Sequence, residues 1–261
     1  MKMKKDQTLD ERCDFFSAKR IEHIVMIRFK ENLLFYASDL SAKEKVMKYL
    51  DLVSESDSIK VVVILGFPYK SGCEEYLEFY RQVFEEKLGQ QAIHRMYNAV
   101  NQLISKIVNL NKIVIHADSG RVISMFLNVS LACDYRIVAD NTVFENPCLK
   151  LGLVPKGGGA FFLSKMLGSS KAFEILLSEK DFTAQEALRL GIVNKVVPSE
   201  QLEESALNTA KEFAQKPSHT LSGVKKLLNY STKDLMECLE LENQVLLRIV
   251  ASRGFWKKVR E

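Results

Sequence analysis

The stretch that decides the fold runs from residue 112 to residue 198. It reads, in order, KIVIHADSG (112–120), LACDYRIVAD (131–140), FENPCLKLGLVPKGGGA (144–160) and LGSSKAFEILLSEKDFTAQEALRLGIVNKVVP (167–198). Short β-branched runs such as 113–115 indicate buried strands, and apolar residues at helical spacing between them indicate helices. Strands, glycine turns and helices that alternate in this way predict an α/β fold.

The same pattern extends upstream of this stretch. Residues 59–65 (IKVVVIL) indicate a strand buried on both faces. A helix is indicated from Ser41, because Glu44 stands three positions later as in a capping box. Residues 21–29 and 33–36 flank a short polar KEN and predict two strands joined by a turn.

Three regions are predicted along the chain. They are a flexible N-terminal segment (1–20), the α/β core (21–197) and a C-terminal helical subdomain (198–261). The third region is set apart because its apolar residues follow helical spacing as far as residue 250, with breaks near Pro217 and Ser231.

The amino-acid composition argues against several classes of function. The formal charge of +4 comes from 37 basic and 33 acidic residues spread along 261 positions. Dispersed charge of this kind argues against a nucleic-acid partner. Five cysteines without a CxxC pair or clustered histidines indicate reduced thiols and no metal site. The charged N-terminus has no apolar stretch, so a cytoplasmic protein without a membrane anchor is expected.

In their order and spacing, the quoted motifs resemble the enoyl-CoA hydratase/isomerase (crotonase) family. The resemblance is strongest over residues 113–198 and extends more weakly over 21–110 and the C-terminal helices, including LSGVKKLLN at 221–229. It implies a crotonase-like spiral of ββα units. It also implies an acyl thioester of coenzyme A or phosphopantetheine as substrate, no bound cofactor, and an acyl carrier protein as an alternative partner.

The resemblance further implies a C-terminal oligomerisation region and a homotrimer or hexamer. The residues that suggest it are apolar and at near-helical spacing: Leu235, Leu239, Leu246 and Val250, with Met236 beside them. Such a stripe is typical of a helix that packs against another helix or subunit.

Family members hold the thioester oxygen with two backbone N–H donors, an oxyanion hole. The resemblance places the first donor at Cys73, after the substrate-binding turn formed by Ser71 and Gly72, and the second at Met125. Removing one such donor costs on the order of 3 kcal/mol. The alternatives are a plain turn at Gly72 and an ordinary helix start at Met125, where Met125 and Phe126 fill the space that glycine leaves open in the family.

Hydratases of the family use two glutamates, and both positions differ here. Counting from ACD gives Asn128, and counting from FENP gives Cys148. An amide holds a water or substrate oxygen but cannot accept a proton. A cysteine serves as base or nucleophile only as a thiolate, which needs a nearby cation or helix N-terminus. The alternative for Cys148 is a small buried apolar residue.

Three other groups are candidates for proton transfer. Tyr76 aligns with a tyrosine of the decarboxylating members of the family, although Tyr80 stands where they have lysine; the alternative is packing on an amphipathic helix. His116, with Asp118 on the same face of its strand, forms either a proton carrier or a satisfied core pair. Glu145 either turns toward the site or lies on the surface.

Two functions follow from these residues. The first is an acyl-thioester enzyme that forms an enolate for isomerase, decarboxylase or hydratase-like chemistry without the glutamate pair, and without standard hydratase activity. The second is a catalytically silent homologue that binds acyl-CoA or completes an oligomer, since the family features kept in this sequence are architectural.

Overall fold

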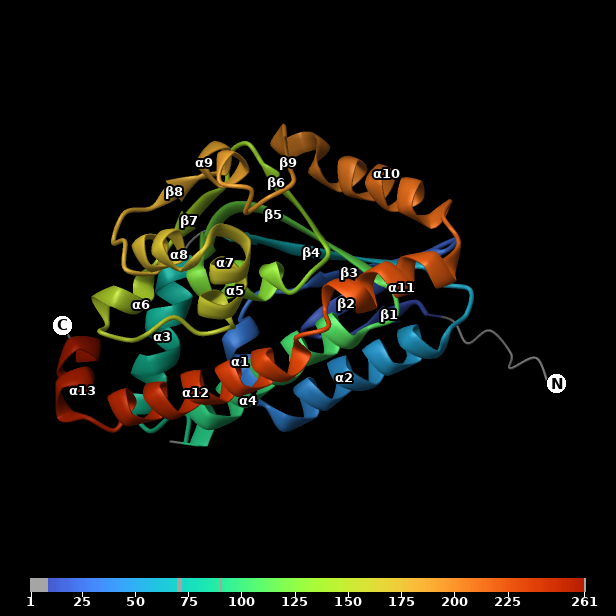
Figure 1. Ribbon diagram of the computed structural model, residues 1–261. Helices are drawn as coiled ribbons and strands as arrows, with labels where there is room; N and C mark the ends of the chain where they lie inside the picture. Colours follow the sequence, from blue (N-terminus) through green and yellow to red (C-terminus); the bar gives the residue numbers. More distant parts are fainter. Residues whose placement is uncertain (1–8, 70–71, 90, 261) are drawn as a thin grey trace.

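The computed structural model describes residues 9–69, 72–89 and 91–260. Figure 1 shows a twisted sheet with helices on both faces. The strands are β1 (Glu11–Arg12), β2 (Phe16–Ile21), β3 (Ile24–Phe29), β4 (Val61–Tyr69), β5 (Ile113–Ile123), β6 (Tyr135–Ala139), β7 (Val143–Glu145), β8 (Phe182–Thr183) and β9 (Lys195–Val197).

The helices occur between the strands along the chain and after the last strand. The helices are α1 (Leu33–Ser38), α2 (Leu40–Glu55), α3 (Gly72–Phe84), α4 (Gln91–Asn109), α5 (Ser124–Leu131), α6 (Pro147–Lys150), α7 (Gly159–Leu167), α8 (Ser169–Leu176), α9 (Ala184–Arg189), the 3-10 turn η1 (Ser199–Gln201), α10 (Leu202–Ala214), α11 (Ser218–Leu228), α12 (Thr232–Val250) and α13 (Arg253–Arg260).

The sheet is ordered β1-β2-β3-β4-β5-β6-β9, and β5 carries a branch. The pairs β1–β2 and β2–β3 are antiparallel, whereas β3–β4, β4–β5, β5–β6 and β6–β9 are parallel. The first part of β5 pairs with β6, and its end pairs with β7, which pairs in turn with β8. Strand β5 therefore connects two successive turns of the spiral, and the chain passes from its end into α5.

Both faces of the central strands are buried, as the apolar run at 59–65 predicts. Val62 and Ile64 pack under α2, α4 and α12, whereas Val61 and Val63 pack under α10. The side chains alternate between the faces because successive residues of a strand point to opposite sides. The two helical layers are visible in Figure 1.

The predicted hairpin is displaced along the chain. Residues 33–36, expected as a strand, belong to helix α1. Strand β3 pairs instead with β2, and residues 16–20 of β2 belong to the segment expected to be flexible. The first turn of α1 is supported by the Glu75 carboxylate of α3, which accepts a hydrogen bond from the Leu34 N–H at 3.2 Å. The α/β core therefore begins before residue 21. Helix α2 is capped by Asp39, whose side chain accepts from the Ala42 N–H, and not by Ser41.

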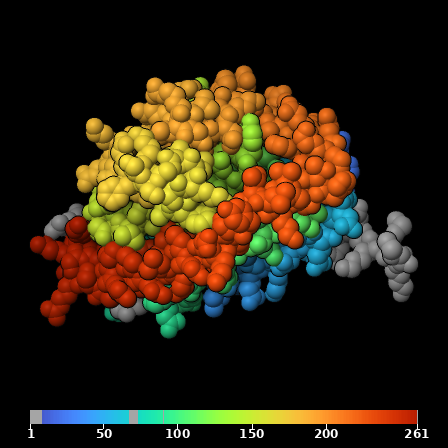
Figure 2. Space-filling view, in the orientation of Figure 1, coloured from blue at the N-terminus to red at the C-terminus, as the bar shows by residue number. Residues whose placement is uncertain are grey.

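The C-terminal helices lie across one face, next to α7 (Figure 2). The residues expected to form a subunit interface, Leu235, Leu239, Leu246 and Val250, are buried within the chain itself. Several of the exposed apolar side chains lie close together on and just after α11, where Val224, Leu227, Leu228 and Tyr230 are 51%, 75%, 66% and 84% exposed. None of the helices in the described ranges is long and apolar enough to cross a membrane.

Candidate active site

The N-terminus of α5 is the centre of the candidate site. Its N-cap, Ile123, offers no side-chain acceptor, and Met125 is the second residue of the helix. First-turn amides have no acceptor within their own helix and carry the positive end of its dipole. The Met125 N–H therefore meets the chemical requirement for the second oxyanion donor.

Helix α5 begins where β5 ends, and the neighbouring strand brings polar groups to the same place. The Ser124 hydroxyl donates to the Asn146 Oδ1 at 3.2 Å and lies 3.5 Å from the Cys148 Sγ. The Asn146 amide in turn donates to two carbonyls at and just after the end of α8, at 3.2 and 3.3 Å. The hydroxyl of Ser124 and the amide of Asn146 therefore provide neutral hydrogen-bonding groups at the start of α5.

The structure brings Tyr76 and Cys148 together. The Tyr76 hydroxyl lies 3.5 Å from the Cys148 Sγ and 3.4 Å from the Tyr80 hydroxyl, and the Tyr80 and Tyr97 hydroxyls are 2.8 Å apart. All four side chains are fully buried. These residues join α3, α4 and α6; α3 and α6 lie at one end of the molecule in Figure 1.

Burial decides the protonation of this group. It raises the pKa of the Cys148 thiol, against smaller lowering effects from its contacts with Tyr76 and Ser124. It also raises the pKa values of Tyr76, Tyr80 and Tyr97. At neutral pH the cluster is therefore uncharged: Cys148 is a thiol, and Tyr76 can donate a hydrogen bond but does not ionise.

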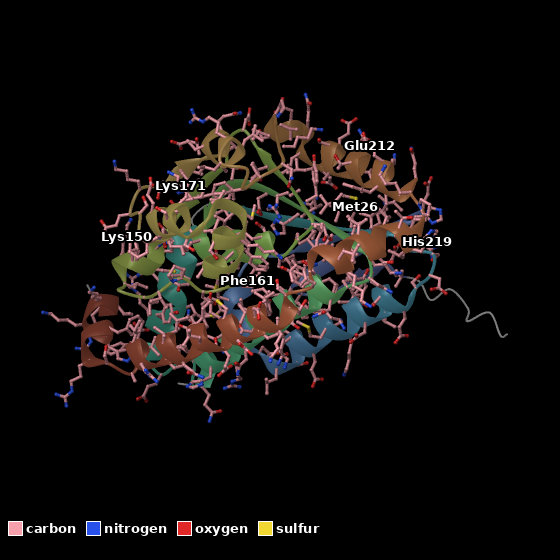
Figure 3. The ribbon with its side chains drawn as sticks, in the orientation of Figure 1. Met26, Lys150, Phe161, Lys171, Glu212 and His219 are labelled. Atoms are coloured by element: carbon pink, nitrogen blue, oxygen red, sulfur yellow. The ribbon has the colours of Figure 1, made fainter. Side chains whose placement is uncertain are left out.

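The first proposed donor lies at the start of α3. Gly72 is the first residue of this helix and Cys73 the second, whereas Ser71 lies outside the described residues. Burial raises the pKa of the Cys73 thiol, and the charges of Lys150 and Arg121 oppose that rise. Lys150 ends α6, at the edge of the molecule labelled in Figure 3. Positive side chains therefore lie near Cys73.

Asn128 is held in place by the glycine turn that precedes α7. Its Nδ2 donates to the Lys156 carbonyl at 2.9 Å, and its side chain is 1% exposed. A Cβ on Gly159 would stand 2.5 Å from that Nδ2 atom. Gly157 and Gly158 have φ values of 104° and 77°, which favour glycine. Gly157, Gly158 and Gly159 therefore form a tight turn that fits around Asn128.

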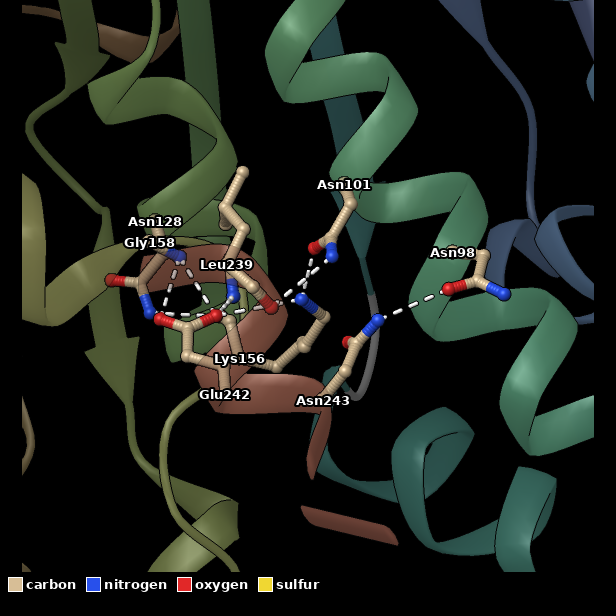
Figure 4. A network of polar contacts seen from close by, with 9 residues as sticks. Asn98, Asn101, Asn128, Lys156, Gly158, Leu239, Glu242 and Asn243 are labelled. Atoms are coloured by element: carbon tan, nitrogen blue, oxygen red, sulfur yellow. Dashed lines mark hydrogen bonds and ion pairs between the residues drawn. The ribbon is translucent and has the colours of Figure 1, made fainter. Parts of the chain in front are cut away.

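A buried ion pair supports the same turn (Figure 4). Glu242 of α12 accepts hydrogen bonds from the Gly157 and Gly158 N–H groups at 3.0 Å, and its carboxylate is 3.4 Å from the Lys156 Nζ. Lys156 also donates to Asn101 of α4. Burial lowers the pKa of Lys156 and raises that of Glu242. The pair joins α4, α12 and the turn; sequence reasoning missed it because its members are 86 positions apart.

His116 and Asp118 form a buried pair on the other side of α5. The His116 Nδ1 lies 2.9 Å from the Asp118 Oδ2. The pair reaches a cavity of about 30 Å³ that is also lined by Phe126 and Val129. Asn128 is two residues from Phe126 and so points to the opposite side of the helix. The structure therefore does not bring His116 together with the Tyr76 and Cys148 cluster.

The Met125 side chain faces away from that cluster. It is 1% exposed and lines an apolar cavity of about 70 Å³ between α1, α2, α4 and α5. Phe126 and Val129 line this cavity as well as the one beside His116. Apolar cavities of this kind accept apolar ligands in preference to water.

Glu145 is buried, contrary to the expectation of a surface carboxylate. It ends β7, and the register pairs it with Ile123, the residue before α5. Its side chain is 4% exposed and lines a cavity of about 20 Å³ with Ser124, Asn128 and Asn146. No group of three or more histidine, cysteine or acidic side chains suited to a metal ion occurs in the described residues.

The branched sheet, the C-terminal helices and the uncapped start of α5 define a protein of the crotonase fold class. The model of the enoyl-CoA hydratase/isomerase family matches residues 22–257, so the chain belongs to the enoyl-CoA hydratase/isomerase family.

Among the relatives is a trans-2-decenoyl-[acyl-carrier-protein] isomerase of Streptococcus mutans, 26% identical over 206 residues that cover 77% of each chain. A short-chain-enoyl-CoA hydratase of Clostridium acetobutylicum is 33% identical over 138 residues, or 53% of this chain and about half (51%) of that one. The crystal structure of an enoyl-CoA hydratase from Bacillus halodurans has a TM-score of 0.81 at 20% identity, covering 95% of this chain and 99% of the other. That likeness confirms the fold.

Proposed function

We propose that the chain binds an acyl thioester and stabilises its enolate at the N-terminus of α5, without the glutamate pair of the hydratases. The observation that carries this proposal is the uncapped first turn of α5, where the Met125 N–H stands beside the neutral Ser124 and Cys148. Charge that develops on a thioester oxygen is stabilised by fixed amide donors, and helix N-termini provide them.

The reaction class is proton transfer next to the thioester, as in isomerisation or decarboxylation. Standard hydration is not expected, because Asn128 cannot titrate and donates to the Lys156 carbonyl, and because Cys148 is a buried thiol with a raised pKa. The named relatives act on a CoA ester and on an acyl-carrier-protein ester, which supports either carrier for this chain.

A second candidate is a catalytically silent acyl-thioester binder. The observation in its favour is the complete burial of Tyr76, Tyr80, Tyr97 and Cys148, which form a packed and uncharged cluster next to the start of α5. This candidate predicts binding of CoA esters without turnover.

We also propose that the chain assembles as a homotrimer or a dimer of trimers. The exposed side chains of Val224, Leu227, Leu228 and Tyr230 provide the apolar surface for it. Neighbouring exposed apolar residues of this size are typical of subunit interfaces.

The role of the Met125 amide can be tested by removing that single N–H. Proline is tolerated in the first turn of a helix and has no amide hydrogen. Met125→Pro deletes both the side chain and the donor, whereas Met125→Ala deletes the side chain alone and is the matched control. Both variants are assayed with enoyl-, malonyl- and hydroxyacyl-CoA esters, and their folding is checked by circular dichroism.

We expect the proline variant to turn over at least about 100-fold more slowly than the alanine variant, the effect of losing one oxyanion donor. Equal rates for the two variants would show that this amide has no catalytic role. Binding of CoA esters by the unaltered chain without any turnover would favour the silent candidate.

A further inference from the structure

The proposed enolate chemistry needs a group that accepts and returns a proton. Asn128 has no titratable proton. Burial raises the pKa values of Cys148 and Tyr76, so neither is an acceptor near neutral pH. His116 lies on the opposite side of α5 from Ser124 and Asn128. None of these candidates therefore places a proton acceptor beside the Met125 amide.

Glu145 is a carboxylate in the required place. The β5–β7 register puts it next to Ile123, one residue before α5 begins. Its side chain lines the same small cavity as Ser124 and Asn128. Ser124 also contacts Cys148, so this cavity adjoins the cluster at the start of α5. A cavity of about 20 Å³ holds one water-sized group.

The two oxygens of Glu145 have different surroundings. Oε1 pairs with Arg121, whose side chain is half exposed and also lies 3.7 Å from Asp181. Oε2 is buried and has no hydrogen-bond partner, one of three such side-chain atoms in the described residues. Leaving a buried acceptor unpaired is unfavourable, which calls for a functional explanation.

We propose that Glu145 is the carboxylate that carries the proton in this site, with Oε2 as the reacting atom. The inference rests on the proposed function, because it needs a thioester at the start of α5. Arg121 pairs with one oxygen, and the other oxygen is an acceptor without a hydrogen-bond partner. Glu145 then replaces the carboxylates that positions 128 and 148 lack.

The step balances without a further reactant. A C–H bond at the α-carbon breaks, its proton forms an O–H bond with Glu145 Oε2, and the electron pair moves into the enolate. The enolate oxygen is stabilised by the backbone donors. Return of the proton to the same carbon gives exchange with solvent, and return two carbons further along an enoyl chain gives isomerisation. No electrons leave the substrate in either case.

The test is α-proton exchange of butanoyl-CoA in D₂O, followed by NMR with the full chain. Glu145→Gln keeps the size of the side chain and removes its basicity, and Asp181→Asn alters the other partner of Arg121 as the matched control. Loss of a positioned acid–base group costs about 10²- to 10⁴-fold. We therefore expect exchange to fall at least about 100-fold in Glu145→Gln and to stay within about twofold in Asp181→Asn, with butanoyl-CoA affinity unchanged in both.

Three outcomes decide between the possibilities. Exchange by Glu145→Gln within about threefold of the unaltered rate would overturn the role of Glu145 and leave the proposed function standing. Binding of butanoyl-CoA by the unaltered chain without exchange would overturn both. If Glu145→Gln does not fold, Glu145→Asp decides by the same criterion: it retains the charge but withdraws the carboxylate by one methylene, so undiminished exchange would again contradict the proposal.

Discussion

The buried Lys156 and Glu242 pair offers a quantitative prediction about the turn that holds Asn128. Lys156 is fully buried, and Glu242 is 8% exposed. Breaking a buried pair by removing one partner costs about 3–5 kcal/mol, because it leaves an uncompensated charge. The remaining contacts moderate this cost: after Lys156→Met, Glu242 still accepts from two glycine N–H groups, and after Glu242→Gln, an amide oxygen still serves them.

We therefore expect each single change to lower the free energy of unfolding by about 3 kcal/mol. The double variant Lys156→Met with Glu242→Gln carries neither charge, so it should lose about 3 kcal/mol and not the sum of about 6. The coupling energy is then about 3 kcal/mol, at the upper end for residues in contact. This coupling energy is large because both side chains are buried and the carboxylate and ammonium are 3.4 Å apart.

These energies are measured by urea unfolding, monitored by circular dichroism. The dependence of the free energy of unfolding on urea concentration should be the same for all variants. The control is the cycle for Lys171 and Glu174, whose shorter distance of 2.8 Å lies between side chains that are 42% and 68% exposed. Exposed pairs couple by at most about 1 kcal/mol. Additivity within about 0.5 kcal/mol at Lys156 and Glu242 would refute the reasoning.

Two further predictions concern packing and assembly. Gly159→Ala should lower the free energy of unfolding by about 1–3 kcal/mol through overpacking. Gly223→Ala lies within a helix and has open space around it, so it should raise the free energy of unfolding by about 0.5–1 kcal/mol. Urea midpoints that shift in the same direction for both variants would contradict this prediction. Light scattering should give the mass of a trimer or hexamer for the unaltered chain. The double variant Leu227→Glu with Leu228→Glu should give the monomer mass, whereas the control Leu52→Glu should not. A monomer mass for the unaltered chain would disprove the assembly.

The family fold could be predicted because its signals are local and their spacing is fixed. The β-branched runs and glycine turns of residues 112–198 each indicate one element, and their order identifies the family. The prediction failed at residues 33–36, where a short apolar run fits either a strand or a helix. A hydrogen bond from Leu34 to Glu75, 41 positions away, favours the helix, and a local pattern cannot reveal such a contact.

The motifs give positions for the candidate site residues, but they do not give the burial or protonation of those residues. Counting from the motifs locates Asn128 and Cys148, and the structure places both near the start of α5. The burial of Glu145 depends on the pairing of β7 between β5 and β8, which residue order does not show. The uncharged state of Cys148 likewise depends on burial, which raises its pKa more than the contact with Tyr76, 72 positions away, lowers it.

The location of the carboxylates limits the reactions open to this chain. Glu242 is engaged with the glycine turn, which leaves Glu145 as the carboxylate in the cavity beside Ser124 and Asn128. Hydration needs one group to position and deprotonate a water and another to protonate carbon. A single carrier can only remove a proton and return it, on one face of a planar enolate. If Glu145 acts as proposed, the chain should therefore exchange or shift protons with retention of the face, and it should not add water to an enoyl thioester.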